Sequence, residues 1–257
     1  MKAARIHEYG KPVVLEDVPI PDIGPDEILI QVKACGMCRS DAQLIDGYFR
    51  PFVDIPTPIT IGHEISGVVS TIGRNVPKIA GFHEGDPVGV APGWGDGVCR
   101  HCLVGNTHIC PNVRWPGFGP YGGFAEYLPV PARYLIKADR GLRFEQIAPL
   151  TDAGLTPYRG IKKLRDAGAL GPGRIVGVFG VGGLGSYAVQ YAKLLGGGAK
   201  VSPSHAMQTS SPSPRRTAPT TSSPSGTRPP KRSRRNLRRL PAKGISTPSS
   251  IAPGPPK

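Results

Sequence analysis

Residues 62–76 read GHEISGVVSTIGRNV, and this stretch decides the fold because a potential metal ligand stands directly before a predicted strand. Within it, residues 65–73 combine β-branched side chains, rough alternation and a closing glycine, a pattern typical of a short strand. The same pattern recurs in three further segments, with Gly or Pro between them: 28–36, 86–92 and 124–131. We therefore expect residues 1 to about 145 to form an irregular β-rich domain.

A different pattern follows this β-rich part. Residues 144–168 place apolar side chains three and four positions apart, which is typical of a helix. Residues 174–180, RIVGVFG, form a continuous apolar run, as expected for a strand buried on both faces of a parallel sheet. A glycine turn then opens a predicted helix, and AKV at 199–201 fits the start of a second strand, after which every such pattern stops. The fold class is α/β with a β-rich part.

The glycine turn has the pattern Gly180-x-Gly182-x-x-Gly185. Glycines at these positions permit a tight turn and a close approach of a pyrophosphate, and the following helix offers backbone N–H groups at its N-terminus. An ordinary strand–turn–helix is the alternative. The location between an apolar strand and a helix favours nucleotide binding, with Gly183 and Leu184 completing the predicted cofactor-binding turn.

Two residues in the β-rich part are candidate ligands of a catalytic metal. A catalytic zinc needs about three protein ligands and one open position. In ACGMCRSD, Cys38 offers a thiolate, and His63 offers an imidazole. Taken singly, each would be read as a packed core residue. GHE with Gly67, Gly73 and Val76 at fixed offsets, however, resembles the zinc signature of the medium-chain alcohol dehydrogenases, and this resemblance favours zinc.

The cysteines point to a second metal site. All five lie between Cys35 and Cys110, and an odd, clustered set argues against a disulfide scaffold and for metal ligation in a reducing compartment. In WGDGVCRHCLVGNTHIC, two and seven residues separate Cys99, Cys102 and Cys110. A closed site in this lobe would stabilise it without contributing chemistry.

Together these motifs resemble the zinc-dependent medium-chain alcohol dehydrogenases over residues 1 to about 201. The resemblance implies a GroES-like catalytic domain in residues 1–150 and the start of a Rossmann coenzyme domain in residues 151–201. It implies oxidation of a small or secondary alcohol to an aldehyde or ketone, with hydride transfer to NAD or NADP. Zn²⁺ in two sites is implied, with one ion acting as a Lewis acid on the substrate oxygen, and so is a homo-oligomer.

The resemblance also assigns roles around the catalytic zinc. The family's ligand is the Cys directly before the RSD triplet, here Cys38, so Cys35 is expected to be a small buried residue. Ser40 occupies the position of the proton-relay hydroxyl, and Glu64 is expected close to the metal. The third ligand is usually a Cys, but APLTDAGLTPY places Asp152 there, and a carboxylate is a competent zinc ligand.

Further site residues follow from the same resemblance. The family's structural zinc has the pattern C-x2-C-x2-C-x7-C, whose first position here is Asp96, so this carboxylate is predicted to complete the set of three cysteines. Asp41 is expected to orient a ligand. Arg39 and Thr156 are the remaining predicted coenzyme-binding residues. Candidate residues of the substrate pocket are Trp94 and Phe49.

The end of the chain departs from this pattern. The net charge is +14, but residues 201–257 hold 11 Lys or Arg and no acidic residue, which leaves +3 for residues 1–200. This segment also lacks Phe, Trp and Tyr and consists mainly of Ser, Pro, Thr, Arg and Ala, so we expect residues 202–257 to be disordered. The resemblance ends at about residue 201, which indicates a truncated or frameshifted chain, and we expect the chain to be inactive.

Two other functions fit parts of the sequence. One is a non-catalytic zinc-binding fragment whose basic tail contacts nucleic acid, although the tail has no aromatic residues for stacking. The other is a zinc-free quinone reductase of the same superfamily, against which the cysteine pattern argues. The N-terminal MKAARIHEYG has no apolar stretch, and no run approaches the ~18 apolar residues of a membrane span, so a cytoplasmic protein is expected.

Overall fold

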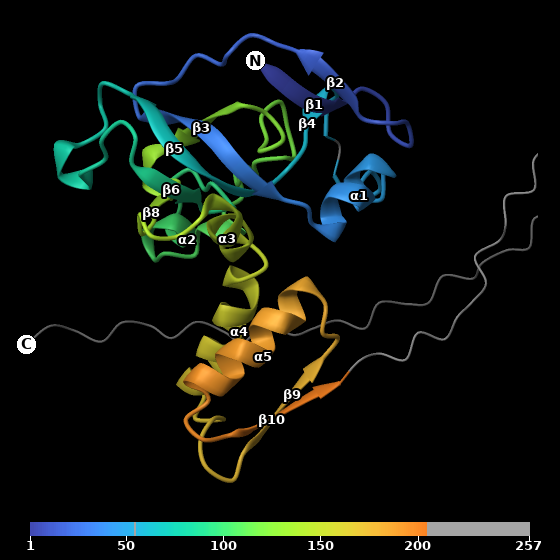
Figure 1. Ribbon diagram of the computed structural model, residues 1–257, viewed down its shortest axis with the longest axis vertical. Helices are drawn as coiled ribbons and strands as arrows, with labels where there is room; N and C mark the ends of the chain where they lie inside the picture. Colours follow the sequence, from blue (N-terminus) through green and yellow to red (C-terminus); the bar gives the residue numbers. More distant parts are fainter. Residues whose placement is uncertain (54, 205–257) are drawn as a thin grey trace, which may run out of the picture. The chain divides into compact units, whose positions relative to one another are not determined.

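The computed structural model describes residues 1–53 and 55–204. Its largest sheet has five antiparallel strands in the order β7-β3-β5-β6-β8 (Figure 1). Their bounds are Tyr127–Pro131 for β7, Glu27–Gly36 for β3, Glu64–Ile72 for β5, Pro87–Val90 for β6 and Leu135–Lys137 for β8. The side chains of one face form the main apolar core: Ile28, Ile30, Ile65, Val69, Val88, Val90, Leu128 and Val130. The expected β-rich domain is confirmed, and each of the four predicted strands is present.

The register of β3 against β5 brings two distant parts of the sequence together. The pairing runs from Ile28 opposite Ile72 to Gly36 opposite Glu64. Because Gly36 ends β3 and Glu64 begins β5, the residues just beyond these two ends emerge side by side. Gly67 permits this close pairing, since a Cβ there would collide with the backbone carbonyl of β3. The glycine in the motif therefore has a steric reason in the sheet itself.

A second, three-stranded sheet in the order β2-β1-β4 packs on helix α1. The bounds are Lys2–Ile6 for β1, Val14–Asp17 for β2, Ile59–Thr60 for β4 and Arg39–Ile45 for α1. Their shared core consists of apolar side chains: Ile6, Leu44, Ile55, Ile59 and Ile61. The short helices of the connecting loops are η1 (Lys78–Ala80), α2 (Arg100–Leu103), η2 (Thr107–Ile109) and η3 (Ala132–Tyr134).

The helical pattern at 144–168 is interrupted in the structure. It divides into α3 (Phe144–Ile147), η4 (Ala148–Thr151) and α4 (Leu155–Asp166). Thr151 explains the interruption, because its hydroxyl accepts a hydrogen bond from the Ile65 backbone N–H of β5 at 3.3 Å and donates to the Ala148 carbonyl at 2.8 Å. This contact fixes η4 against β5 and leaves Asp152 at a bend with φ −129° and ψ −65°. The helix is therefore interrupted, and Asp152 lies at the interruption.

The last described elements are β9 (Ile175–Phe179), α5 (Gly183–Leu195) and β10 (Lys200–Ser204). The two strands are parallel, and a small core joins them to the helices: Ile161, Val176, Val178 and Ala192. The predicted end of regular structure after Val201 is wrong by three residues, because Ser204 still pairs with Phe179. Backbone pairing in an edge strand needs no apolar side chain. The predicted disorder of residues 205–257 lies outside the described residues.

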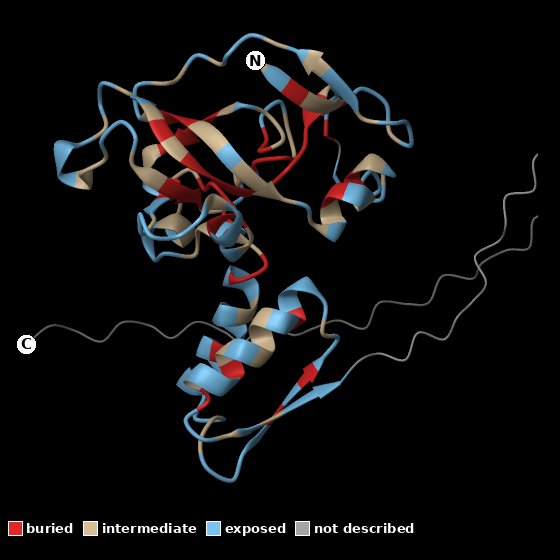
Figure 2. Cartoon of the chain, viewed as in Figure 1, coloured by how far each residue is buried: buried red, intermediate tan, exposed pale blue. Residues whose placement is uncertain are grey.

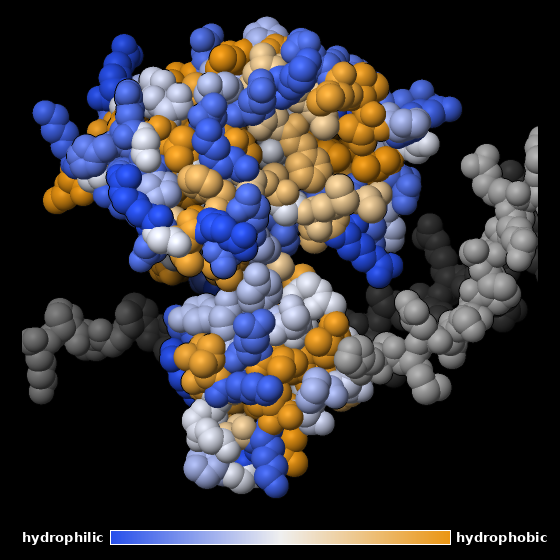
Figure 3. Space-filling model, viewed as in Figure 1, coloured by the Kyte–Doolittle hydropathy of each residue, from blue (hydrophilic) through white to orange (hydrophobic). Residues whose placement is uncertain are grey.

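The expected burial of β9 on both faces is also wrong for the described residues. Val176 and Val178 are buried, but Ile175 and Phe179 are 71% and 87% exposed. The reason is that α5 packs against β9 and β10 from one side, while the described sheet has two strands only. In Figure 2 these strands are mostly pale blue, and Figure 3 shows hydrophobic side chains at the surface of this part of the chain. No helix in the described ranges is long and apolar enough to cross a bilayer.

Candidate metal centres and the adjoining pocket

Three potential ligand side chains meet where β3, β5 and η4 converge. Cys38 precedes α1 just after β3, His63 directly precedes β5, and Asp152 follows η4. Asp152 Oδ2 lies 3.9 Å from Cys38 Sγ and 3.6 Å from His63 Nε2. All three ligand atoms lie within 4.8 Å of one another. A thiolate, an imidazole and a carboxylate at these separations form the donor set of a zinc site with three protein ligands. We call this group the catalytic cluster; its role in binding metal stays a prediction.

Asp41 supports two members of the catalytic cluster. Its Oδ1 lies 3.1 Å from His63 Nδ1, and both atoms are buried without another hydrogen-bond partner in the structure. Its Oδ2 accepts a hydrogen bond of 2.8 Å from the Cys38 backbone N–H. With Nδ1 turned to Asp41, the Nε2 atom of His63 faces Cys38 and Asp152. A metal-ligating histidine has this arrangement when its second nitrogen donates to a carboxylate.

The electrostatics of the catalytic cluster favour a positive charge. Burial lowers the pKa of His63, but hydrogen bonds with Asp152 and Asp41 outweigh burial and raise this pKa to about 11. Burial and the charge of Asp152 raise the pKa of the neighbouring Glu64. Carboxylates packed around one imidazole therefore favour a positive charge among them, which either a proton or a divalent metal can supply. The residues present fit a zinc ion.

A pocket of about 730 Å³ opens onto the catalytic cluster, with Ser40, His63 and Asp152 in its wall. The Ser40 hydroxyl lies 3.3 Å from His63 Nε2, as expected for a group placed near a metal-bound substrate. The rest of the wall is mainly apolar or aromatic: Val53, Ile55, Trp94, Val113, Arg114, Trp115, Phe118, Gly119, Pro120 and Tyr121. Such a lining with a few polar groups at one end is typical of a site for a small organic molecule.

Sequence reasoning found only part of this pocket. Trp94 lines it as predicted, but Phe49 does not, because its ring packs behind the wall against Phe118 at 5.6 Å between centroids. Three further aromatic residues of the wall were missed: Trp115, Phe118 and Tyr121. The sequence could have indicated Trp115 as a pocket residue. Trp94 and Trp115 are the only tryptophans of the chain, and they flank the cysteine-rich loop.

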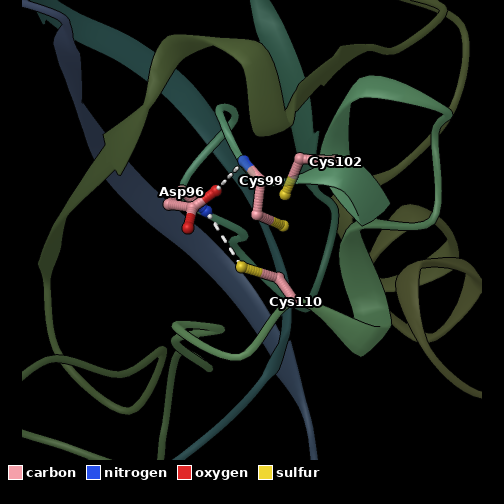
Figure 4. Close-up of side chains that lie close together, drawn as sticks. All are labelled: Asp96, Cys99, Cys102 and Cys110. Atoms are coloured by element: carbon pink, nitrogen blue, oxygen red, sulfur yellow. Dashed lines mark hydrogen bonds between the residues drawn. The ribbon is translucent and has the colours of Figure 1, made fainter.

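The second group of ligands lies in a single loop (Figure 4). Its four ligand atoms lie within 4.8 Å of one another: Asp96, Cys99, Cys102 and Cys110. Asp96 Oδ1 accepts hydrogen bonds from the backbone N–H groups of Val98 and Cys99 at 2.9 and 3.0 Å, and the Asn112 amide donates to Oδ2 at 2.9 Å. We call this group the loop cluster. The structure brings together all four residues that were predicted to share a structural zinc, and zinc binding stays a prediction.

The charge state of the loop cluster also suits a cation. Hydrogen bonds from the Cys99 and Val98 backbone lower the pKa of Asp96, so that this carboxylate is ionised. A backbone hydrogen bond from Cys102 lowers the pKa of Cys99, whereas burial raises the pKa of Cys102 to about 12. One carboxylate and three thiols in a closed set of four donors fit the structural class of zinc site. Metal binding there would release the protons of the remaining thiols.

The glycine turn has the predicted strand–turn–helix geometry. Gly180 has φ +85°, and its N–H donates to the Ser204 carbonyl at 2.8 Å. Gly182 precedes α5, and Gly183 and Leu184 begin it. Gly185 is buried against the Gly180 carbonyl, with which a Cβ would collide. The turn thus leaves the backbone N–H groups at the start of α5 available, although dinucleotide binding itself stays a prediction.

The other predicted site residues lie around these groups without joining them. Glu64 is buried beside the catalytic cluster but is outside the set of three mutually close ligand atoms. Arg39 is exposed at the start of α1, and Thr156 is exposed at the start of α4, where its N–H donates to the Asp152 carbonyl at 3.0 Å. Cys35 belongs to neither cluster, and burial raises the pKa of its thiol.

Comparison with known proteins places this geometry in a family. Residues 24–140 match the sequence profile of the alcohol dehydrogenase GroES-like domain. An NAD-dependent alcohol dehydrogenase of Sulfurisphaera tokodaii is 39% identical over 204 residues, which cover 77% of this chain and 56% of that protein. The chain therefore spans a little over half the length of the relatives it matches.

Solved structures agree with the sequence comparison. The alcohol dehydrogenase of Aeropyrum pernix matches with a TM-score of 0.72 and 38% identity, covering 79% of this chain and 58% of that one. A cobalt- and zinc-bound thermostable alcohol dehydrogenase of Pyrobaculum aerophilum matches with a TM-score of 0.67 and 34% identity, covering 78% and 59%. Both similarities extend beyond residues 24–140, since they cover more of the chain than the GroES-like domain does.

Proposed function

Since the chain belongs to the alcohol dehydrogenase family, whose GroES-like domain it carries in residues 24–140, we propose that it forms the metal- and substrate-binding part of a zinc-dependent alcohol dehydrogenase. The observation that supports this function most directly is the convergence of Cys38, His63 and Asp152 on the wall of a largely apolar pocket. The reaction is oxidation of an alcohol to an aldehyde or ketone with hydride transfer to NAD or NADP.

The residues around the pocket have distinct roles in this proposal. Zinc at the catalytic cluster would supply a Lewis acid that lowers the pKa of an alcohol. Asp41 fixes the ring of His63 through Nδ1 so that Nε2 remains a ligand. The Ser40 hydroxyl accepts the alcohol proton and passes it towards solvent, and Glu64 is buried close to the metal position. The apolar wall holds the carbon skeleton of a small alcohol.

The coenzyme belongs to the turn at 180–185. There the pyrophosphate of NAD or NADP would meet the backbone N–H groups at the start of α5, with Arg39, Thr156 and Leu184 as further contacts. The described coenzyme sheet has two strands, so we expect turnover by this chain alone to be absent or very slow. The same proposal includes a catalytic domain over residues 1–150 and a coenzyme domain from residue 151. It also includes a cytoplasmic location and the homo-oligomeric assembly of the family.

Cobalt substitution tests the proposal without requiring turnover. The full chain is stripped of metal and loaded with Co²⁺, whose visible spectrum depends on its ligands. We expect two equivalents to bind and benzyl alcohol to change the spectrum. In the Cys38→Ser variant, one equivalent and the response to alcohol should be lost. The proposal fails if folded protein takes up no metal at the catalytic cluster, or if the alcohol response survives in Cys38→Ser.

The alternative function is a zinc-binding fragment that contacts nucleic acid through its basic tail. It rests on residues 205–257, which lie outside the described residues, and the matched relatives named above support the dehydrogenase instead. A mobility shift of nucleic acid with a steep dependence on salt would favour this alternative.

A further inference from the structure

Both tryptophans of the chain stand at the base of the loop that carries the loop cluster. Trp94 lies two residues before Asp96, and Trp115 lies five residues after Cys110. The strands of the loop are joined at this base, because the Trp94 N–H donates to the Arg114 carbonyl at 2.7 Å and the Arg114 N–H donates to the Trp94 carbonyl at 2.9 Å. The Arg114 guanidinium also lies over the Trp94 ring, 5.9 Å from its centroid. Trp94 and Arg114, which close the loop that carries the loop cluster, therefore also form part of the pocket wall.

Three consecutive residues connect the pocket to the loop cluster by direct packing. A Cβ on Gly93 would lie 3.2 Å from the Trp115 ring, so this glycine packs on the indole. Trp94 faces the pocket. A Cβ on Gly95 would lie 2.6 Å from Cys102 Sγ, so this glycine packs on the sulfur of a cluster residue. Gly93, Trp94 and Gly95 thus form a continuous packed path between the Trp115 ring and Cys102.

The middle of this connection is held by hydrogen bonds from the sheet. The Gly95 carbonyl accepts from the buried Tyr134 hydroxyl and from Arg133 Nη2, each at 2.9 Å. The Trp94 indole N–H donates to the Ala91 carbonyl at 2.8 Å. The backbone is therefore fixed on the sheet side, and the loop cluster packs against its other side.

We infer that cation binding at the loop cluster positions the aromatic wall of the pocket, so that the loop cluster acts on ligand binding as well as on stability. The inference rests on the proposed function in taking this pocket as the alcohol site. Without a cation, nothing draws the four ligand atoms of the loop cluster together, and the loop opens at Cys102. Gly95 then loses its contact with Cys102, and Trp94 and Trp115 shift together through the bridge at Arg114.

Tryptophan fluorescence reports this coupling directly, because both tryptophans line the pocket. Zinc is added to metal-free Cys38→Ser protein, in which the loop cluster is the remaining predicted site. We expect a blue shift and better protection from acrylamide quenching, both complete at one equivalent. In metal-free Cys102→Ser protein, which keeps the catalytic cluster, zinc should leave both signals unchanged. Trp94→Phe and Trp115→Phe in the Cys38→Ser background should each retain the response.

Each other outcome overturns the inference. A response in Cys102→Ser, or none in Cys38→Ser with zinc bound, would place the coupling elsewhere. Should far-UV circular dichroism collapse in the metal-free Cys38→Ser protein, the loop cluster would be a folding requirement and not a positioning device. The proposed function can fail separately: a fluorescence response in protein whose cobalt spectrum ignores benzyl alcohol would keep the coupling and remove the dehydrogenase assignment.

Discussion

The two candidate metal clusters are built in opposite ways. The loop cluster draws all its ligands from residues 96–110, whereas the catalytic cluster joins Cys38, His63 and Asp152, of which the first and last are 114 residues apart in sequence. A short loop can gather its ligands with little help from the rest of the chain. The catalytic cluster exists only after β3 has paired with β5 and η4 has docked on β5. The difference indicates that one cluster supports the fold and the other depends on it.

The strongest test of this difference is loss of a ligand from each cluster. A structural zinc binds the folded loop and not the unfolded chain, so its binding stabilises the fold. We therefore expect Cys102→Ser to lower the melting temperature by more than about 10 °C in scanning calorimetry. The matched variant Cys38→Ser should change it by no more than a few degrees. Equal losses in the two variants would end the distinction between the clusters.

A smaller effect is expected at the carboxylate behind His63. Asp41→Asn keeps the size of the side chain but removes the charge that faces Nδ1 and supports the Cys38 backbone. Changes of this kind typically cost about 10- to 100-fold in metal affinity. Zinc competition with a chromophoric chelator should show this loss at the catalytic cluster and none at the loop cluster. Unchanged affinity at both would leave Asp41 without a supporting role.

Tyr134→Phe probes the support of the loop from the sheet. The variant removes the buried hydroxyl that donates to the Gly95 carbonyl, while Arg133 still donates to the same oxygen. We expect a loss of about 1 kcal/mol in the free energy of unfolding by urea. Zinc affinity of the catalytic cluster should stay as in the parent protein. A larger fall at the catalytic cluster than at the loop cluster would contradict the assignment of Tyr134 to the loop.

The smallest effect concerns acid stability away from both clusters. Backbone hydrogen bonding from His83 and the charge of Arg140 lower the pKa of Asp86. A carboxyl whose pKa is depressed in the fold stabilises it above the unfolded pKa and loses this contribution as the pH falls through the folded pKa. Asp86→Asn should therefore cost about 0.5 kcal/mol at pH 7, and the difference should shrink as the pH falls below the usual carboxyl range. Urea unfolding across this range measures it, and a growing difference at low pH would refute it.

The sequence was sufficient to predict the β-rich domain and the side chains that the structure brings together, for identifiable reasons. His63 directly precedes a strand whose alternation and closing glycine are local signals, and the spacing of Cys99, Cys102 and Cys110 is itself the geometry of a metal loop. Asp152 was predicted from the resemblance and not from local pattern, because the apolar spacing around it is helical and only Pro149 signals a break. The bend comes from a hydrogen bond between Thr151 and β5, a contact distant in sequence.

Long-range contacts also account for what was not predicted. Ile175 and Phe179 were predicted to be buried but are exposed. An apolar run does not show whether helices will cover one face of its strand or both. Most of the aromatic wall of the pocket was missed. Trp115 and Tyr121 come near the catalytic cluster only because the loop that carries the loop cluster closes between Trp94 and Arg114. The boundary at residue 150 and the ligand roles stay predictions.

The pairing of Gly36 with Glu64 has a consequence for how the length of the chain can vary. Side chains alternate between the faces of a strand, so deleting one residue within β5 would turn every later side chain to the wrong face and draw His63 away from Cys38. An added residue at Ile79, which is 97% exposed on η1, would disturb neither strand. Homologous chains should therefore differ in length between β5 and β6 while keeping the interval from His63 to Ile72 constant.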